Sequence, residues 1–175
     1  MLERWPKSIM ILHWLTALFV VTLLVVGIVM SDMPADSGTR QMMGRMHSMG
    51  GVTLMVIVLI RAITRLRMHL RGPKVEPLPV SELHRKGVGF THALMYLVLF
   101  AVGAMGMATG ATSAWPDYMG GVLERAPDLH ENPFREAHEV LAFVLVALIV
   151  LHVGGVMVQE LQKKRVLRRM IGFLP

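Results

Sequence analysis

The sequence predicts an all-α protein, a four-helix transmembrane bundle with both termini on the cytoplasmic side. Hydrophobic residues make up 54% of the 175-residue chain, and four apolar runs stand out within it. These runs cover residues 9–30, 46–66, 89–112 and 136–158. Each has roughly the 20 residues that an α-helix needs to cross about 30 Å of hydrocarbon, and none alternates as a barrel strand does. We therefore expect a single membrane domain over residues 1–175.

The positions of the basic residues predict the orientation. Most of the eighteen lysines and arginines lie before the first run, around the loop between the second and third runs, or in the C-terminal tail. The other two loops contain only Arg40, Arg45, Arg125 and Arg135, together with most of the acidic residues. Because positively charged loops stay on the cytoplasmic side, we expect the termini and the middle loop there.

Charge and composition also exclude several classes of function. A net charge of +6 is compatible with either nucleic acid or anionic lipid as a partner. Because the basic residues flank apolar runs, we expect the partner to be membrane lipid and not nucleic acid. The absence of cysteine excludes disulfides, iron–sulfur clusters, thiol catalysis and covalent c-type haem.

Two features inside the runs have competing interpretations. Arg61 interrupts the second run, so its side chain either extends to the lipid headgroups or pairs with a buried group. Gly106 and Gly110 form a G-x-x-x-G motif in the third run, which favours close helix packing over a cofactor role.

Histidines are the residues in this sequence most suggestive of chemistry. Those in or at the ends of apolar runs are His13, His47, His92, His138 and His152. An ionisable residue inside a membrane is energetically costly, so a functional role is favoured, although any one of them could simply bond to a neighbouring helix. His69, His84 and His130 lie in polar segments, where we expect them to be solvated.

Spacing arranges four of these histidines in pairs. His138 and His152 lie on one run two heptads apart, so they share a face and are about 21 Å apart along the helix axis. His13 matches the depth of His152, and His47 matches that of His138. Two cross-helix pairs suit two haems, with His13 and His152 as axial ligands of an inner haem and His47 and His138 of an outer one. A zinc site, which needs about four ligands together, fits less well.

The glycines that follow His47 and His152, and the many methionines, each have two possible explanations. Gly50 and Gly51 follow His47, and Gly154 and Gly155 follow His152, as a flat macrocycle would require, but simple helix packing explains them equally well. The sixteen methionines favour the filling of irregular apolar space over axial Met ligands.

Several short motifs occur in one order along almost the whole chain. They are His13-Trp14, His47-x-x-x-Gly51 followed by Arg61 and Arg65, His92-Ala-Leu-Met-Tyr96, His138-Glu139 with His152, and the tail Val166-Leu-Arg-Arg-Met170. Together they resemble the bacterial cytochrome b561 family of dihaem membrane proteins. The resemblance implies a multi-pass protein of the bacterial inner membrane, with haem b at both sites and electron exchange with ubiquinone.

The resemblance leaves the electron donor open. Some members are similar to superoxide oxidases, so one expectation is a superoxide:ubiquinone oxidoreductase that takes electrons at its outer face; the few outer arginines weigh against a site that steers a small anion. The alternative is a haem-bearing membrane-anchor subunit that passes electrons between quinone and a hydrogenase- or dehydrogenase-like partner. A haem-free transporter or structural bundle is the third reading, and the histidine pairs argue against it.

The remaining membrane histidine suggests where quinone binds. His92 has no ligand role if two haems use the other four, and Tyr96 lies one turn further on the same helix face. With Arg61, Arg85 or Lys86 as a cation, these side chains could bind the quinone carbonyls and supply protons. Alternatively, His92 bonds only a haem propionate or a backbone carbonyl, and Arg61 pairs with a propionate of the inner haem.

Overall fold

The fold is a bundle of four long helices. The computed structural model describes residues 4–72, 75 and 80–171, and this part of the chain is helical and contains no strand. Its elements are α1 (Lys7–Ser31), α2 (Gly38–Arg71), α3 (Glu82–Ala111), α4 (Trp115–Gly120), α5 (Pro133–Leu161) and a 3-10 turn (Leu167–Arg169). The helices α1, α2, α3 and α5 are long and apolar enough to cross a membrane, so the predicted fold class is confirmed.

All four long helices begin earlier than predicted, and two of them begin much earlier. The helix α2 starts at Gly38 rather than near Met46, and α3 starts at Glu82 rather than Gly89. Ser37 and Ser81 cap them, each accepting a hydrogen bond from a backbone N–H three residues ahead. The apolar runs mark only the part of each helix that suits hydrocarbon, whereas the caps set where the helix begins. His47, which stands at the start of the predicted run 46–66 and would therefore open the second helix, instead lies well inside α2.

The connection between α3 and α5 is also set by local chemistry. The short helix α4 ends at Gly121, whose φ of 82° is a left-handed conformation that favours glycine. Asn132 then caps α5 by accepting hydrogen bonds from the backbone N–H groups of Phe134 and Arg135, at 3.0 and 3.2 Å, and Pro133 occupies the first turn.

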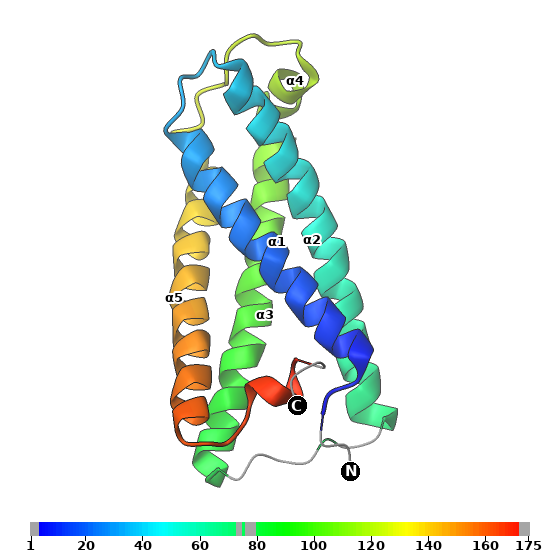
Figure 1. Cartoon of the computed structure of the whole chain (residues 1–175). Helices are drawn as coiled ribbons and strands as arrows, with labels where there is room; N and C mark the ends of the chain where they lie inside the picture. Colours follow the sequence, from blue (N-terminus) through cyan, green and yellow to red (C-terminus); the bar gives the residue numbers. More distant parts are fainter. Residues whose placement is uncertain (1–3, 73–74, 76–79, 172–175) are drawn as a thin grey trace.

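Packing joins the helices into two close pairs. The helix α1 packs along α2 and α3 along α5, while α2 and α3 make the weaker contact between the pairs. A cluster from all four helices forms the core: Val20, Leu54, Val58, Val98, Leu99, Leu145 and Leu148. Figure 1 shows α1 crossing the bundle diagonally, with α4 at one end.

The two ends of the bundle differ, and we name them by what they contain. The end with α4 is the α4 end. The opposite, terminal end holds the start of α1 and the segment after α5, which are joined by a 3.3 Å hydrogen bond from the Trp5 amide to the Arg169 carbonyl. Both ends of the described chain therefore lie on the same side of the bundle (Figure 1).

Candidate functional site

The structure brings His13 and His152 together near the terminal end. His13 projects from the second turn of α1 and His152 from the last third of α5, and their ring centroids are 6.3 Å apart. His92 of α3 joins this pair, with its ring centroid 5.1 Å from that of His152. All three side chains are partly buried.

A second pair lies toward the α4 end. His47 of α2 and His138 of α5 have ring centroids 6.0 Å apart. The Nδ1 atom of His138 lies 2.8 Å from the Val102 carbonyl and donates to it, which leaves the Nε2 lone pair free. Metal-ligating histidines characteristically donate their other ring N–H in this way. The core cluster separates this pair from the first, because Leu145 and Leu148 lie between His138 and His152 on α5.

The spacing of both pairs fits a metal held between two imidazoles. A coordinating imidazole nitrogen lies about 2 Å from its metal, so two rings on opposite sides have centroids about 6 Å apart. The observed 6.3 and 6.0 Å match this, whereas the 5.1 Å between His92 and His152 is too short. Among the described residues, no three His, Asp or Glu side chains are arranged to hold a metal ion alone. Each pair therefore suits a metal whose other ligands come with it, as they do in haem.

Two glycines make room for the rings of the second pair. A Cβ atom on Gly27 of α1 would come within 3.1 Å of Cε1 of His47, and one on Gly106 of α3 would come within 3.1 Å of Cε1 and Nδ1 of His138. The buried Nδ1 of His47 has no hydrogen-bond partner among the described residues. Both rings are thus held in narrow slots between helices.

The glycines singled out in the sequence behave differently from one another. Gly50 packs against Leu23, where a Cβ atom would come within 2.9 Å of that side chain. Around Gly51, Gly154, Gly155 and Gly110 no atom lies within 4 Å of an added Cβ. Close packing in the G-x-x-x-G motif therefore occurs at Gly106 and not at Gly110. Gly27, which the sequence analysis missed, stands alone in α1 without a motif that could have marked it.

Arg61 and Tyr96 complete the group around His13. Arg61 Nη2 lies 2.8 Å from His13 Nδ1, and its guanidinium is 5.2 Å from the centre of the Tyr96 ring. Because a guanidinium only donates, Nδ1 of His13 accepts this hydrogen bond and the ring proton lies on Nε2. If Nε2 held a metal, that proton would move to Nδ1, and Arg61 would then donate to another acceptor. Arg61 thus pairs with a buried group rather than extending to the lipid headgroups.

The hydrogen bonds of His92 and Tyr96 leave polar atoms for a ligand. His92 Nδ1 donates to the Val88 carbonyl at 2.7 Å, so its Nε2 is the available atom. The Tyr96 hydroxyl is buried and has no partner in the described part of the chain. A buried hydroxyl without a partner is unfavourable, so this hydroxyl is a candidate to bind a polar atom of a ligand.

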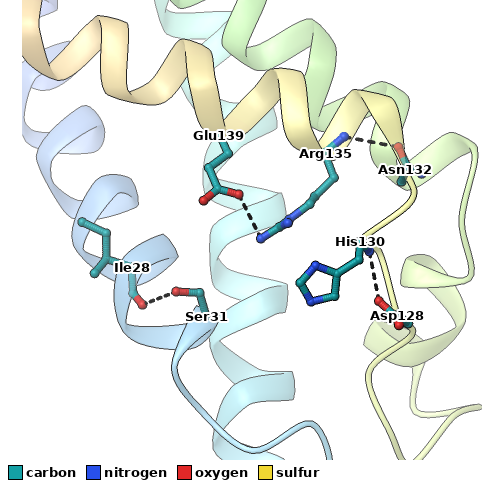
Figure 2. A network of polar contacts seen from close by, with 7 residues as sticks. All are labelled: Ile28, Ser31, Asp128, His130, Asn132, Arg135 and Glu139. Carbon is teal, nitrogen blue, oxygen red and sulfur yellow. Dashed lines mark hydrogen bonds and ion pairs between the residues drawn. The ribbon is translucent and has the colours of Figure 1, made fainter.

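The arginines at the α4 end are largely engaged by the protein itself. Arg40 donates to the Met33 carbonyl at 2.8 Å, Arg45 donates to the Met119 carbonyl, and Arg135 pairs with Glu139 at 2.9 Å. Figure 2 shows the Arg135–Glu139 pair beside the Asn132 cap of α5, with His130 facing Arg135 from the loop. His130 is exposed, as are His69 and His84, although His84 also lies 3.2 Å from the buried Gln159 amide.

Comparison with known proteins agrees with this geometry. Residues 4–173 match the prokaryotic cytochrome b561 family. Two curated relatives from Escherichia coli K12 are similar: "Cytochrome b561 homolog 1" is 26% identical, with 97% of this chain and 98% of that protein aligned. "Cytochrome b561 homolog 2" is 28% identical over 97% of this chain and 92% of that protein. No solved structure matches the chain significantly.

The family match covers nearly the whole chain, and four spanning helices are present. The protein is thus a multi-pass protein of the bacterial inner membrane that binds haem b and takes part in membrane electron transfer. The chain belongs to the prokaryotic cytochrome b561 family.

Proposed function

We propose that the protein holds two haem b groups and transfers electrons between a donor at its outer face and ubiquinone. His13 and His152 are the axial ligands of one haem, and His47 and His138 those of the other. The observation that carries this proposal is the spacing of the two pairs, 6.3 and 6.0 Å between ring centroids, at opposite ends of the core cluster. When bound, each haem supplies a one-electron redox centre.

The orientation follows from charge. The terminal end carries the basic tail Lys163, Lys164, Arg165, Arg168 and Arg169, and by the positive-inside rule it faces the cytoplasm. The His13–His152 pair is then the inner site, and the His47–His138 pair is the outer one. Electrons that enter at the outer face reach the inner site across the width of the core cluster.

Ubiquinone binds beside the inner pair in this proposal. The unpartnered Tyr96 hydroxyl can donate a hydrogen bond to a carbonyl oxygen of the quinone, and the Arg61 guanidinium lies over the Tyr96 ring. Nε2 of His92, whose ring proton is on Nδ1, can accept a hydrogen bond from a hydroxyl of the quinol form. Reduction of the quinone needs two electrons and two protons, and a histidine on the cytoplasmic side can pass protons from that compartment. The chain's own part is thus to orient the quinone and to hold protons near it.

The test is anaerobic reduction of the purified protein by a short-chain ubiquinol. We expect the absorption bands of reduced haem b to appear with saturable dependence on ubiquinol, and the dithionite-reduced protein to be reoxidised by ubiquinone. If haem is bound but neither reaction exceeds the rate seen with denatured protein, the quinone part of the proposal is wrong.

A second candidate is the haem-bearing anchor subunit of a hydrogenase- or dehydrogenase-like partner. It is favoured by the charge of the outer loops, because Arg135 is paired with Glu139 and the other arginines there, Arg40, Arg45 and Arg125, lie among several acidic residues, which leaves little net positive charge to steer superoxide to the outer site. Pulsed superoxide should then reduce the haem no faster than the background, and mild solubilisation should recover a large soluble partner. Rapid reduction by superoxide would instead favour the superoxide:ubiquinone oxidoreductase.

A further inference from the structure

The inner histidine pair lies between two helices that barely touch each other. His13 is on α1 and His152 on α5, yet α1 packs chiefly on α2 and α5 chiefly on α3. The spacing between the two ligands therefore depends on whatever joins α1 to α5 at this end. The segment after α5 is the part of the described chain that crosses between them (Figure 1).

This segment turns back from α5 in a defined way. Lys163 and Arg165 both adopt left-handed backbone conformations, with φ of 59° and 49°, which reverse the chain. The Glu160 carboxylate of α5 then accepts a hydrogen bond from the Leu167 amide at 2.6 Å. The segment is thus fixed to α5 at the start of the 3-10 turn Leu167–Arg169.

The other end of the segment is fixed to α1 next to the proposed ligand. Trp14 Nε1 donates a 2.8 Å hydrogen bond to the Met170 carbonyl. The Trp14 ring also packs against the preceding residue, with its centroid 5.3 Å from that of His13. The Trp5–Arg169 backbone hydrogen bond adds a second connection to the chain just before α1.

We propose that residues 162–171 form a clasp that sets the separation of α1 and α5, and that Trp14 is a positioning residue for His13 within it. The motifs His13-Trp14 and Val166-Leu-Arg-Arg-Met170, which lie at opposite ends of the sequence, meet in this one structural unit. The inference rests on the proposed function only for the identity of the group between His13 and His152.

The first experiment needs no haem. The chain contains no cysteine, so spin labels can be introduced at exposed positions by Ile11→Cys on α1 and Val158→Cys on α5. Trp14→Phe removes the N–H donor and keeps an aromatic ring, and Glu160→Ala removes the other attachment. Each should broaden the α1–α5 distance distribution in haem-free protein. Unchanged distributions in both variants would overturn the clasp.

The second experiment measures the ligand pair itself in the haem-loaded protein. Trp14→Phe and Glu160→Ala should each change the electron paramagnetic resonance signal of the inner haem. Each should also increase, several-fold, the rate at which the inner haem is lost to a haem-scavenging protein. Because both act through one clasp, the double variant should add little to the larger single effect. Independent, additive effects would contradict a shared clasp.

A matched control exists at the other end of the bundle. Trp115 Nε1 donates to Ser48 Oγ at 3.2 Å, so Trp115→Phe deletes the same kind of bond near the outer pair. This variant should leave the inner signal and the rate of inner haem loss unchanged. An equal effect of Trp115→Phe would mean general loosening of the bundle and would overturn the role of Trp14. Absence of haem from the inner pair of the unaltered protein would instead refute the proposed function, while the distance measurement would still test the clasp.

Discussion

Gly106 of α3 lies directly against the imidazole ring of His138 of α5. A Cβ atom at Gly106 would come within 3.1 Å of Cε1 and Nδ1 of that ring, which is closer than most real Cβ contacts. The same Nδ1 donates to the Val102 carbonyl of α3, so the ring cannot easily move away without losing this bond. One helix thus both makes room for the proposed ligand and orients it.

The first prediction follows from this contact. Gly106→Ala should displace the His138 ring and lower haem occupancy at the outer site, with little effect on the inner one. Gly110→Ala is the matched control, because nothing lies within 4 Å of a Cβ there. Alanine in place of a helical glycine otherwise favours the helix by roughly 0.5–1 kcal/mol. Haem content and thermal stability should therefore fall in the first variant and stay equal or rise in the second; the same outcome in both would refute the contact's importance.

The second prediction concerns the proposed quinone position. Tyr96→Phe removes a buried hydroxyl that has no partner in the described protein, so it should not destabilise the fold. If that hydroxyl hydrogen-bonds to a quinone oxygen, the variant should keep both haems but have a higher KM for ubiquinol. The loss of a hydrogen bond of about 1.4 kcal/mol corresponds to a KM raised about tenfold. Unchanged kinetics would mean that the hydroxyl serves another group, such as a haem propionate.

His92→Ala provides the third prediction. The variant should slow ubiquinol-driven haem reduction, because it removes the group proposed to hold a proton at the quinone. In the unaltered protein the His92 ring lies beside His152, so the substitution could also disturb haem binding. Haem content is therefore measured first, and only variant protein that retains both haems is informative. Equal rates and equal quinone affinity in such protein would exclude His92 from the site.

The fourth prediction tests how the α4 end is held together. Tyr118 is fully buried, and its backbone carbonyl accepts a 2.6 Å hydrogen bond from Gln41 of α2. Tyr118→Ala should lower the free energy of unfolding by about 3–5 kcal/mol, the usual range for deleting a large buried aromatic. Tyr118→Phe, which keeps the ring, should cost only about 0.5–1.5 kcal/mol. Denaturation in detergent measures both; equal losses would show that the ring's packing is not what matters.

Parts of the fold could be read from the sequence because the membrane imposes them. The length of an apolar run and the two-heptad spacing of His138 and His152 fix which helices span and which residues share a face. Depth matching then paired His13 with His152 and His47 with His138, and the structure brings each pair together. These are regular properties of helices and need no knowledge of packing.

Other parts depend on tertiary contacts that no local pattern encodes. The slot at Gly27 and the hydrogen bond between Arg61 and His13 come from helix crossing angles and rotamers. The polar turns that lengthen α2 and α3 fall outside a hydropathy window, although Ser37 and Ser81 could have marked their starts as caps. Contact between Trp14 and Met170 joins residues at opposite ends of the sequence, which spacing along one helix cannot reveal.

The most direct test of the central claim is the number of haem b groups per chain, measured as the pyridine haemochromogen in the unaltered protein and in His138→Ala and His152→Ala. Two bis-histidine sites predict two haems per chain in the unaltered protein and one in each variant, with a different low-spin resonance signal lost in each. One haem per chain in the unaltered protein, or retention of both haems in either variant, would contradict the assignment of His13 with His152 and His47 with His138.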